Sequence, residues 1–432
     1  MNFERSANYL LSLGNEVSAM KLRLASMQKL LAELGDPQVK FFKLQVAGTN
    51  GKGSVCAFLD AVLRAAKLRV GLYTSPHLSS MAERIKIDGE KIDEREFAAL
   101  ATRVRAASER LVERGELGAV PTFFEQMTAI AMLAFKKAKV DIAILETGLG
   151  GRLDATTAAE AEIAAITRID RDHEKYLGNS LRSIAAEKAA IIRKNTQFAV
   201  LGEQPASIGR QLAKRCREVG VPFCEAGRIE VQSLHDTVEF KGERAVYRVK
   251  KLGLSGLHQV ENAKAAIALA EHLSEKFKIT RKNIESGLRN AVNPGRLERI
   301  GRFLLDGAHN VGGMKALARY LRENIDAPIT LVFAVMGDKN ARAMMREAFP
   351  LARSIVLTQA ANSRSMPYQQ MLSSMPAEIS AERTFVTDNV ASAIQAAETV
   401  DIDAVIVVAG SLYLVGEARE LIRQRRGGLK IR

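Results

Sequence analysis

Short apolar runs alternate with helix-length amphipathic stretches along most of the chain, and this alternation restricts its fold more than any other feature. In the N-terminal part, each run is followed by polar or glycine residues, and the runs lie at 43–47, 69–73, 140–145, 162–167 and 198–201. Such runs are typical of buried parallel strands, and the amphipathic stretches are typical of helices that cover a sheet. The pattern predicts an α/β fold.

The same alternation resumes after Asn293-Pro294-Gly295, where two helix breakers coincide. Further strands are predicted at 302–305, 329–334, 354–357, 383–386 and 404–408. Between the two series, residues 229–251 alternate in the manner of an antiparallel hairpin that is added to the first domain. Because 432 residues exceed the length of one typical domain, we predict two doubly wound α/β domains, over 1–293 and 294–432.

Composition and charge narrow the class of protein. Three cysteines without a C-x-x-C pair predict neither a disulfide framework nor a zinc site, and they indicate a reducing compartment. The N-terminus lacks the pattern of a secretory signal and the apolar runs are too short to span a bilayer, so we expect a cytoplasmic protein without membrane association. The net charge of +14 favours anionic partners, but 5% aromatic residues and scattered basic residues argue against nucleic acid.

A glycine-rich loop, Gly48-Thr49-Asn50-Gly51-Lys52-Gly53-Ser54, lies between the first strand and the apolar helical stretch 55–66. Glycines let backbone N–H groups converge on phosphate oxygens, and the helix N-terminus and Lys52 add positive charge. The pattern G-x-x-x-x-G-K-[ST] is not met, because Val46 replaces its first glycine and Gly53 separates the lysine from Ser54. A turn without a ligand would explain the glycines but not the lysine and hydroxyls, so we predict a phosphate-binding loop.

Further motifs follow this loop in order: Thr74-Ser-Pro-His-Leu78, Glu146-Thr-Gly-Leu-Gly-Gly-Arg-Leu-Asp-Ala-Thr156, Asp172-His173, Leu177-Gly178, Glu187-Lys188-Ala189, His258-Gln259, Asn262-Ala263, Pro294-Gly-Arg-Leu-Glu298, Asp306-Gly-Ala-His-Asn310 and Gly410-Ser-Leu-Tyr-Leu414. With the loop, they cover nearly the whole chain and resemble the folylpolyglutamate synthase and dihydrofolate synthase family of the Mur-ligase superfamily. The resemblance implies a P-loop-type ATP-binding central domain over 1–293 and a smaller Rossmann-like ligase domain over 294–432.

The resemblance also implies a reaction in folate biosynthesis and one-carbon metabolism. A folate carboxylate attacks the γ-phosphate of MgATP, and the amine of L-glutamate then displaces phosphate from the acyl phosphate. The implied small molecules are ATP, Mg2+, L-glutamate, and a folate or dihydropteroate, and we expect a monomer.

A metal site is expected where strands end. Glu146 follows the predicted apolar strand 141–145, so its carboxylate lies at a strand's carboxyl end, where doubly wound sheets bind ligands. The alternative is a carboxylate that only caps the following glycine turn. The resemblance implies that Ser75, Glu146 and His173 hold Mg2+, although imidazole is an unusual ligand for this ion.

The resemblance implies that Lys52, His173 and Lys188 take part in catalysis and that Lys188, in the predicted helix 181–194, is carbamylated. Without the resemblance, a helical lysine beside Glu187 is interpreted as a solvated surface charge.

Nucleotide contacts from the linker and the second domain are implied for Asn262, Arg296, Asp306 and His309, in addition to the glycine-rich loop. A guanidinium just past the hinge, at Arg296, would reach phosphate only on domain closure. An ordinary interdomain ion pair is the alternative for this residue.

Two segments resemble those that hold a pterin, namely Thr122-Phe123-Phe124-Glu125 and Leu153-Asp154-Ala155. Their aromatic and acidic character suits a flat heterocycle with N–H donors, although both phenylalanines are equally explained as core residues. This sequence departs from the family at Leu22-Arg-Leu-Ala-Ser26, which loses a glycine and two charges, at Thr157, where asparagine is usual, and at Asp170-Arg171.

Two other functions remain open on the sequence alone. One is a Mur-superfamily ligase for a different carboxylate, such as a peptidoglycan precursor. The other is a nonenzymatic protein that binds nucleotides or nucleic acid through its positive charge.

Overall fold

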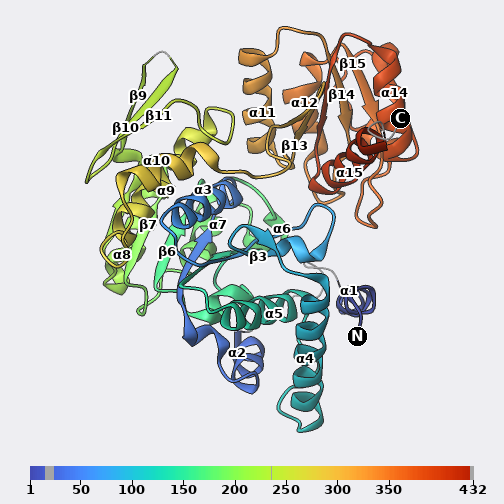
Figure 1. Ribbon diagram of the computed structural model, residues 1–432. Coiled ribbons are helices and arrows are strands. Elements are labelled where there is room, and N and C mark those ends of the chain that lie inside the picture. The colour runs from blue at the N-terminus through green and yellow to red at the C-terminus, as the bar shows by residue number, and fades with distance from the viewer. Residues whose placement is uncertain (15–23, 235, 429–432) are drawn as a thin grey trace. The chain divides into compact units, whose positions relative to one another are not determined.

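The computed structural model describes residues 1–14, 24–234 and 236–428 (Figure 1). The chain forms two compact units, each with its own sheet. The first unit comprises Met1–Ile169, Ser180–Gly253 and Glu261–Val292, and the second comprises Asp170–Asn179, Leu254–Val260 and Asn293–Arg432. The chain therefore passes between the units several times.

The first unit is built on an eight-stranded sheet with the order β4-β3-β2-β5-β1-β6-β7-β8. The six neighbouring strands β2, β5, β1, β6, β7 and β8 run parallel to one another. At the edge beyond β2, strand β3 pairs antiparallel with β2, and β4 pairs antiparallel with β3. Their bounds are β1 Phe42–Ala47, β2 Val70–Tyr73, β3 Ile85–Ile87, β4 Glu90–Lys91, β5 Ile142–Glu146, β6 Ile163–Ile166, β7 Phe198–Leu201 and β8 Phe223–Glu225. The five predicted strands of this series correspond to β1, β2, β5, β6 and β7.

Helices cover both faces of this sheet (Figure 1). The helix α5 is buried along most of its length because it is apolar on nearly all sides, and it packs on one face with α1, α2 and α4 around it. On the other face α3 packs against α10, where a Cβ on Gly287 would lie 2.4 Å from Val62 Cα. The helices are α1 Phe3–Ser12, α2 Leu24–Glu33, α3 Lys52–Ala65, α4 Glu94–Glu113, α5 Phe123–Ala138, α7 Leu181–Ala189, α8 Ala206–Val219, α9 His258–Leu273 and α10 Arg281–Asn290.

The segment 229–251 contains the predicted antiparallel hairpin, formed by β10 Thr237–Lys241 and β11 Val246–Val249. A further strand that was not predicted, β9 Glu230–Leu234, pairs with β10 and completes a three-stranded sheet separate from the main one. The buried Glu271 of α9 anchors this small sheet, because its carboxylate accepts a hydrogen bond from the Tyr247 hydroxyl of β11 at 2.9 Å. The helix predicted over 181–194 ends at Ala189, because Ile191 and Ile192 turn into the core.

The second unit contains a six-stranded sheet with the order β12-β13-β17-β14-β15-β16, parallel except for β12. The strands are β12 Glu298–Ile300, β13 Phe303–Asp306, β14 Ile329–Phe333, β15 Ser354–Leu357, β16 Thr384–Val386 and β17 Val405–Ala409, and the helices are α6 Glu174–Leu177, α11 Val311–Asn324, α12 Ala341–Ala348, α13 Tyr368–Ser373, α14 Val390–Val400 and α15 Leu412–Gly428. Its core includes the edge-to-face rings of Phe333 and Phe349, 5.2 Å apart. The predicted fold class, α/β with two sheets covered by helices, is confirmed.

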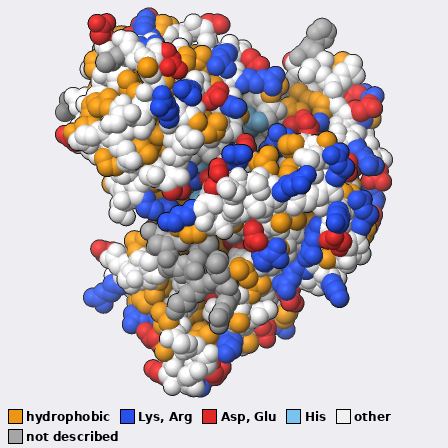
Figure 2. Space-filling view, turned by 180° about the vertical axis from the view of Figure 1, so that it is seen from behind, with side chains coloured by type: hydrophobic (Ala, Val, Ile, Leu, Met, Phe, Trp, Pro, Cys, Tyr) orange, Lys and Arg blue, Asp and Glu red, His pale blue; other side chains and the backbone are white. Residues whose placement is uncertain are grey.

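The described part of the chain has no helix that is long and apolar enough to cross a membrane. On the face shown in Figure 2, Lys and Arg side chains are interspersed with Asp and Glu rather than gathered into one patch.

Candidate functional site

The glycine-rich loop connects the carboxyl end of β1 to α3. The N–H groups of Thr49 and Asn50 donate to the carbonyl oxygen of Arg168 at 2.9 and 3.1 Å, which fixes the loop against the segment after β6. The first N–H groups of α3 have no acceptor within the helix and lie at the positive end of its dipole. This arrangement suits an anion such as a phosphate.

Two residues of the loop show how closely it is held. Gly51, the residue before α3, has φ of 91°, and a Cβ on it would lie 2.2 Å from Oδ1 of Asn262 in α9. Lys52 turns back so that its Nζ donates to the carbonyl oxygen of Gly48 at 3.1 Å. The structure thus brings the predicted nucleotide residue Asn262 against the loop.

Glu146 is the last residue of β5, which pairs with β1 in the middle of the sheet. Its side chain is 6% exposed, and Oε2 accepts the N–H of Ser75, which follows β2, at 3.2 Å. Burial, followed by the charge of Glu146, raises the pKa of the Cys56 thiol in α3, whereas Lys52 lowers it. A carboxylate and a hydroxyl are oxygen ligands of the kind that Mg2+ takes, together with phosphates.

His173, the third predicted metal ligand, belongs to the second unit, whereas Ser75 and Glu146 belong to the first. The ring Nδ1 of His173 lies 3.9 Å from a carboxylate oxygen of Asp338, and burial lowers the pKa of His173 to about 4. Among the residues with described coordinates, no three His, Cys, Asp or Glu side chains form a group that could hold a metal by itself. The oxygens of Ser75 and Glu146 fit a metal that takes its other ligands from phosphates.

A buried charged cluster surrounds Asp172 within the second unit. Lys339 Nζ lies 2.5 Å from Asp172 Oδ1, and Asn310 Nδ2 donates to Oδ2 at 3.1 Å. The ring Nε2 of His309 lies 3.6 Å from Oδ2. Burial raises the pKa of Asp172, but the His309 hydrogen bond and the nearby positive charges lower it more, so this carboxyl titrates well below its usual range. It therefore stays ionised.

Lys339 and Asn310 were not predicted as site residues from the sequence. Asn310 ends one of the motifs quoted above, and Lys339 follows a predicted strand at a glycine turn, Gly337-Asp338. Polar residues in the loop that follows the carboxyl end of a parallel strand are a signal that would have found both.

Three predicted nucleotide residues meet around Gly307, directly after β13. Arg296 Nη1 donates to the carbonyl oxygen of Gly307 at 3.1 Å, and His309 Nδ1 lies 2.8 Å from the same oxygen. The Asp306 carboxylate accepts the N–H groups of Leu297 and Ala308, both at 2.9 Å. It therefore fixes the backbone next to Arg296 and next to His309.

The predicted pterin segment 122–125 begins α5. Thr122 caps the helix, and Glu125 Oε2 accepts both the N–H and the hydroxyl of Thr122 at 2.8 Å. The hydroxyl of Ser26 in α2 donates to Oε1 at 2.7 Å. Phe123 is a buried core residue, whereas the ring of Phe124 lies against Gly148, where a Cβ would approach it to 2.6 Å.

The residues at which this sequence departs from the family lie in different parts of the structure. Leu22 and Arg23 lie outside the described residues, whereas Ser26 is placed in α2. Thr157 donates its hydroxyl to the carbonyl oxygen of Gly151 at 2.7 Å. Asp170 and Arg171 lead into the Asp172 cluster.

The second predicted pterin segment, 153–155, ends the loop after β5. Leu153 is exposed and Ala155 is buried, and burial raises the pKa of Asp154. Asp154 Oδ2 accepts the N–H groups of Gly148 and Leu149 at 2.9 and 3.0 Å. This carboxylate therefore closes the loop.

Lys188 lies in α7 with 5% of its surface exposed, so it is not the solvated surface charge of the alternative interpretation. A Cβ on Gly151 would lie 3.0 Å from the carbonyl oxygen of Lys188. The loop that begins after Glu146 thus packs directly against the helix that carries Lys188.

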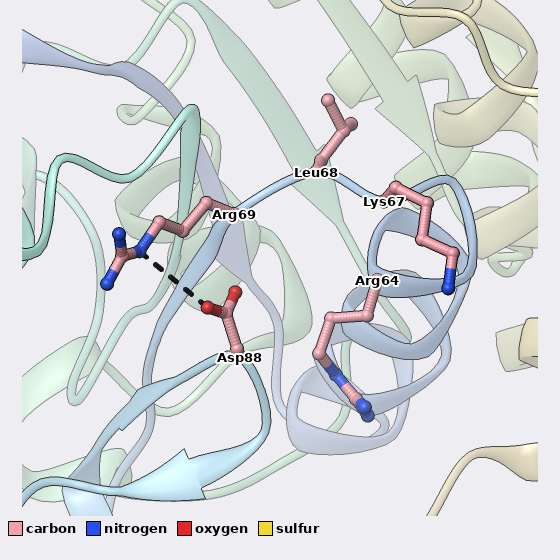
Figure 3. Close-up of a pocket in the computed structure, with 5 residues that line it drawn as sticks. All are labelled: Arg64, Lys67, Leu68, Arg69 and Asp88. Atoms are coloured by element: carbon pink, nitrogen blue, oxygen red, sulfur yellow. Dashed lines mark ion pairs between the residues drawn. The ribbon is translucent and has the colours of Figure 1, made fainter.

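A separate hollow of about 380 Å³ lies at the opposite, amino edge of the same sheet, beside the end of α3 (Figure 3). It is lined by Arg64, Lys67, Leu68, Arg69 and Asp88. Figure 3 shows the Arg64 and Arg69 side chains pointing apart, and Arg69 Nε lies 3.7 Å from Asp88. Ligands of doubly wound sheets bind at the carboxyl edge, so this hollow is not the candidate site.

The sequence matches two family models, the Mur ligase middle domain over residues 46–270 and the Mur ligase, glutamate ligase domain, over residues 295–412. It is 36% identical over 357 residues to the dihydrofolate synthase/folylpolyglutamate synthase of Bacillus subtilis, a match that covers 78% of this chain and 80% of that protein.

A probable bifunctional folylpolyglutamate synthase/dihydropteroate synthase of Haloferax volcanii is 35% identical over 435 residues, which cover 97% of this chain and 50% of that protein. A Halobacterium salinarum protein of the same description is covered to 51%. The chain therefore spans about half the length of these two relatives.

Solved structures are similar over almost the full chain. Mycobacterium tuberculosis folylpolyglutamate synthase complexed with ADP superposes with a TM-score of 0.91 at 30% identity, covering 97% of this chain and 98% of that one. A bifunctional folylpolyglutamate synthase/dihydrofolate synthase with Mn, AMPPNP and L-glutamate bound gives a TM-score of 0.84 at 28% identity, with 98% of both chains covered.

Proposed function

The chain belongs to the Mur ligase family and, within it, to the folylpolyglutamate and dihydrofolate synthases, and from this premise we propose that it is an ATP-dependent ligase of L-glutamate. Its carboxylate substrates are folates and also dihydropteroate. The observation that carries the proposal is the convergence, in the first unit, of the glycine-rich loop, Asn262 and the strand-end pair of Ser75 and Glu146. The ADP complex of a relative at 30% identity supports nucleotide binding.

The proposed reaction has two steps. An oxygen of the folate carboxylate attacks the γ-phosphorus of ATP, so that ADP leaves and an acyl phosphate forms. The amine of L-glutamate then attacks the acyl carbon, phosphate leaves, and the amine gives up a proton as the amide forms. Such chemistry is accelerated mainly by positioning and by neutralising charge on the transferred group.

The roles of the residues follow from their surroundings. The loop 48–54 and Lys52 hold the phosphates of ATP, and Asn262, Arg296, Asp306 and His309 hold the rest of the nucleotide. Ser75, Glu146 and His173 would hold Mg2+, which when bound neutralises phosphate charge. A relative solved with Mn and L-glutamate supports a divalent metal.

Lys188 acts near the reacting groups in a carbamylated form, together with Lys52 and His173. The segments 122–125 and 153–155 shape the pterin pocket, Phe124 and Leu153 by contact and Glu125 and Asp154 by fixing the backbone. We also propose an ATP-binding domain over 1–293, a ligase domain over 294–432, and a cytoplasmic monomer with small-molecule partners only. The buried or partly buried free thiols Cys56, Cys216 and Cys224 fit a reducing compartment.

One assay tests the proposal: purified protein, MgATP and labelled L-glutamate, with dihydropteroate or tetrahydrofolate supplied separately. We expect label in both products. Lys52→Ala and Glu146→Ala should each lower kcat/KM by about a thousandfold or more, because Lys52 would neutralise the phosphates directly and Glu146 would hold the metal that neutralises them. Lys214→Ala, which changes an exposed lysine of α8, should match the wild type. A wild-type protein that labels neither product would refute the proposal, as would full activity in either active-site variant.

A further inference from the structure

A buried glutamine lies in a central strand of the first sheet, at a position where an apolar residue is usual. Gln45 is in the middle of β1, paired with Leu145 on one side and Ala164 on the other, and only 2% of its surface is exposed. Its neighbours Leu44 and Val46 are completely buried. A buried amide costs free energy unless its hydrogen bonds are satisfied, so its presence here calls for specific partners.

Those partners are threonine hydroxyls of the segment that follows Glu146. Gln45 Nε2 donates to Oγ1 of Thr156 and to Oγ1 of Thr157, both at 2.8 Å, and Thr147 Oγ1 lies at 3.3 Å. Thr156 and Thr157 are themselves buried. One side chain of β1 therefore holds both ends of the segment 147–157.

The hydroxyls of Thr156 and Thr157 each accept a hydrogen bond from Gln45 and donate one to a further acceptor. Thr156 Oγ1 donates to Asp154 Oδ1 at 2.5 Å, and Thr157 Oγ1 donates to the carbonyl oxygen of Gly151 at 2.7 Å. Asp154 also receives the N–H groups of Gly148 and Leu149. Chains of hydrogen bonds with one donor direction strengthen one another in a low dielectric.

The segment held in this way touches three parts of the candidate site. It begins directly after Glu146, it meets the Phe124 ring at Gly148, and it meets the Lys188 backbone at Gly151. The glycine-rich loop is held by other contacts, to Arg168 and Asn262. A change at Gln45 should therefore disturb the folate side of the site more than the phosphate side.

We propose that Gln45 is a positioning residue for the ligase reaction: through Thr156 and Thr157 it fixes the segment 147–154 against Glu146, Phe124 and Lys188. This inference rests on the proposed function. The network consists of an amide, hydroxyls and one buried carboxylate, and it sets the place of the folate carboxylate relative to the phosphate loop.

The test uses the full chain and the variants Gln45→Met, Thr156→Val and Thr157→Val, which keep side-chain shape while removing hydrogen-bonding groups. We expect each to raise KM for the folate substrate about tenfold, the effect of roughly one lost hydrogen bond, and to leave KM for ATP within about twofold. Thr330→Val is the matched control, because Thr330 is an equally buried and hydrogen-bonded threonine of β14 in the second unit. Its folate KM should stay at the wild-type value.

A second measurement does not depend on any activity. Hydrogen exchange of the amides of Gly148 and Leu149 should speed up about tenfold in Gln45→Met and Thr156→Val, while exchange in α3 stays unchanged. Should exchange stay at the wild-type rate in both variants, or should the ATP and folate KM values rise together, the positioning role is wrong. If exchange speeds up but the wild-type protein has no ligase activity, the network stands and the proposed reaction is what fails. Should Gln45→Met not fold, the two threonine variants decide.

Discussion

At the scale of single residues, Gly51 shows how the glycine-rich loop depends on the absence of a side chain. Its φ of 91° is one that L residues rarely adopt, and a Cβ would stand 2.2 Å from Asn262 Oδ1. Gly115, after α4, also has a positive φ of 71°, but nothing lies within 4 Å of its missing Cβ. The two positions thus separate backbone strain from a steric clash.

We predict that Gly115→Ala costs about 1 kcal/mol of folding free energy and leaves nucleotide binding unchanged, because it adds only backbone strain. Gly51→Ala should cost more and weaken binding of a nonhydrolysable ATP analogue at least tenfold, because Asn262 must move. Urea titration and calorimetry measure the two effects. Equal nucleotide affinity in both variants would mean that the contact between Gly51 and Asn262 does not shape the nucleotide site.

At the scale of elements, the start of α5 combines a helix cap with one of the two predicted pterin segments. Thr122 and Glu125 form a capping box, in which each side chain satisfies the other residue's backbone N–H. The helix α10 of the same unit begins with the equivalent pair of Thr280 and Asn283. The caps are alike, but only the first lies in a predicted pterin segment.

Thr122→Ala and Thr280→Ala should therefore each lower the free energy of unfolding by about 1 kcal/mol, the usual value of an N-cap. Only Thr122→Ala should also raise KM for the folate substrate, because its loss frees the Glu125 carboxylate. Steady-state kinetics and urea titrations of the two variants provide the comparison. A raised folate KM in Thr280→Ala would show that general loss of stability, not the cap at α5, is responsible.

At the scale of the whole molecule, the two units are interleaved along the chain. The second unit takes residues Asp170–Asn179 and Leu254–Val260 from within the first. Nevertheless, its six strands and its apolar core lie within residues 293–432. The inserted residues contribute Asp172, which pairs with Lys339, whose side chain is 8% exposed.

We predict that a fragment of residues 293–432 folds cooperatively, because it holds the complete sheet and core. In the full chain, Lys339→Met should cost about 3 kcal/mol, because it leaves the buried Asp172 carboxylate without its main partner. In the fragment, which lacks Asp172, the same change should be nearly neutral. Urea unfolding of the full chain and of the fragment, each with and without Lys339→Met, gives the loss of folding free energy in both contexts. A similar loss in the fragment would rule out the pairing with Asp172 as the cause.

The sequence by itself determined the strands and the positions of the motifs. Residues 354–357 were predicted as a strand and form β15 without a change of bounds, because a short apolar run that is buried on both faces leaves a local pattern. The glycine-rich loop and Glu146 were expected at strand ends, and they lie there. The carboxyl ends of parallel strands share one edge of a sheet, so this much follows from order along the chain.

Only the tertiary structure decided which distant residues meet. Asp172 and Lys339 are separated by 167 positions, and Gln45 and Thr157 by 112, and no local pattern marks such pairs. The extra strand β9 and the early end of α7 also depended on packing against other elements rather than on periodicity. Apolar periodicity reports which side of an element is buried, but the partner of a buried polar group is set by long-range geometry.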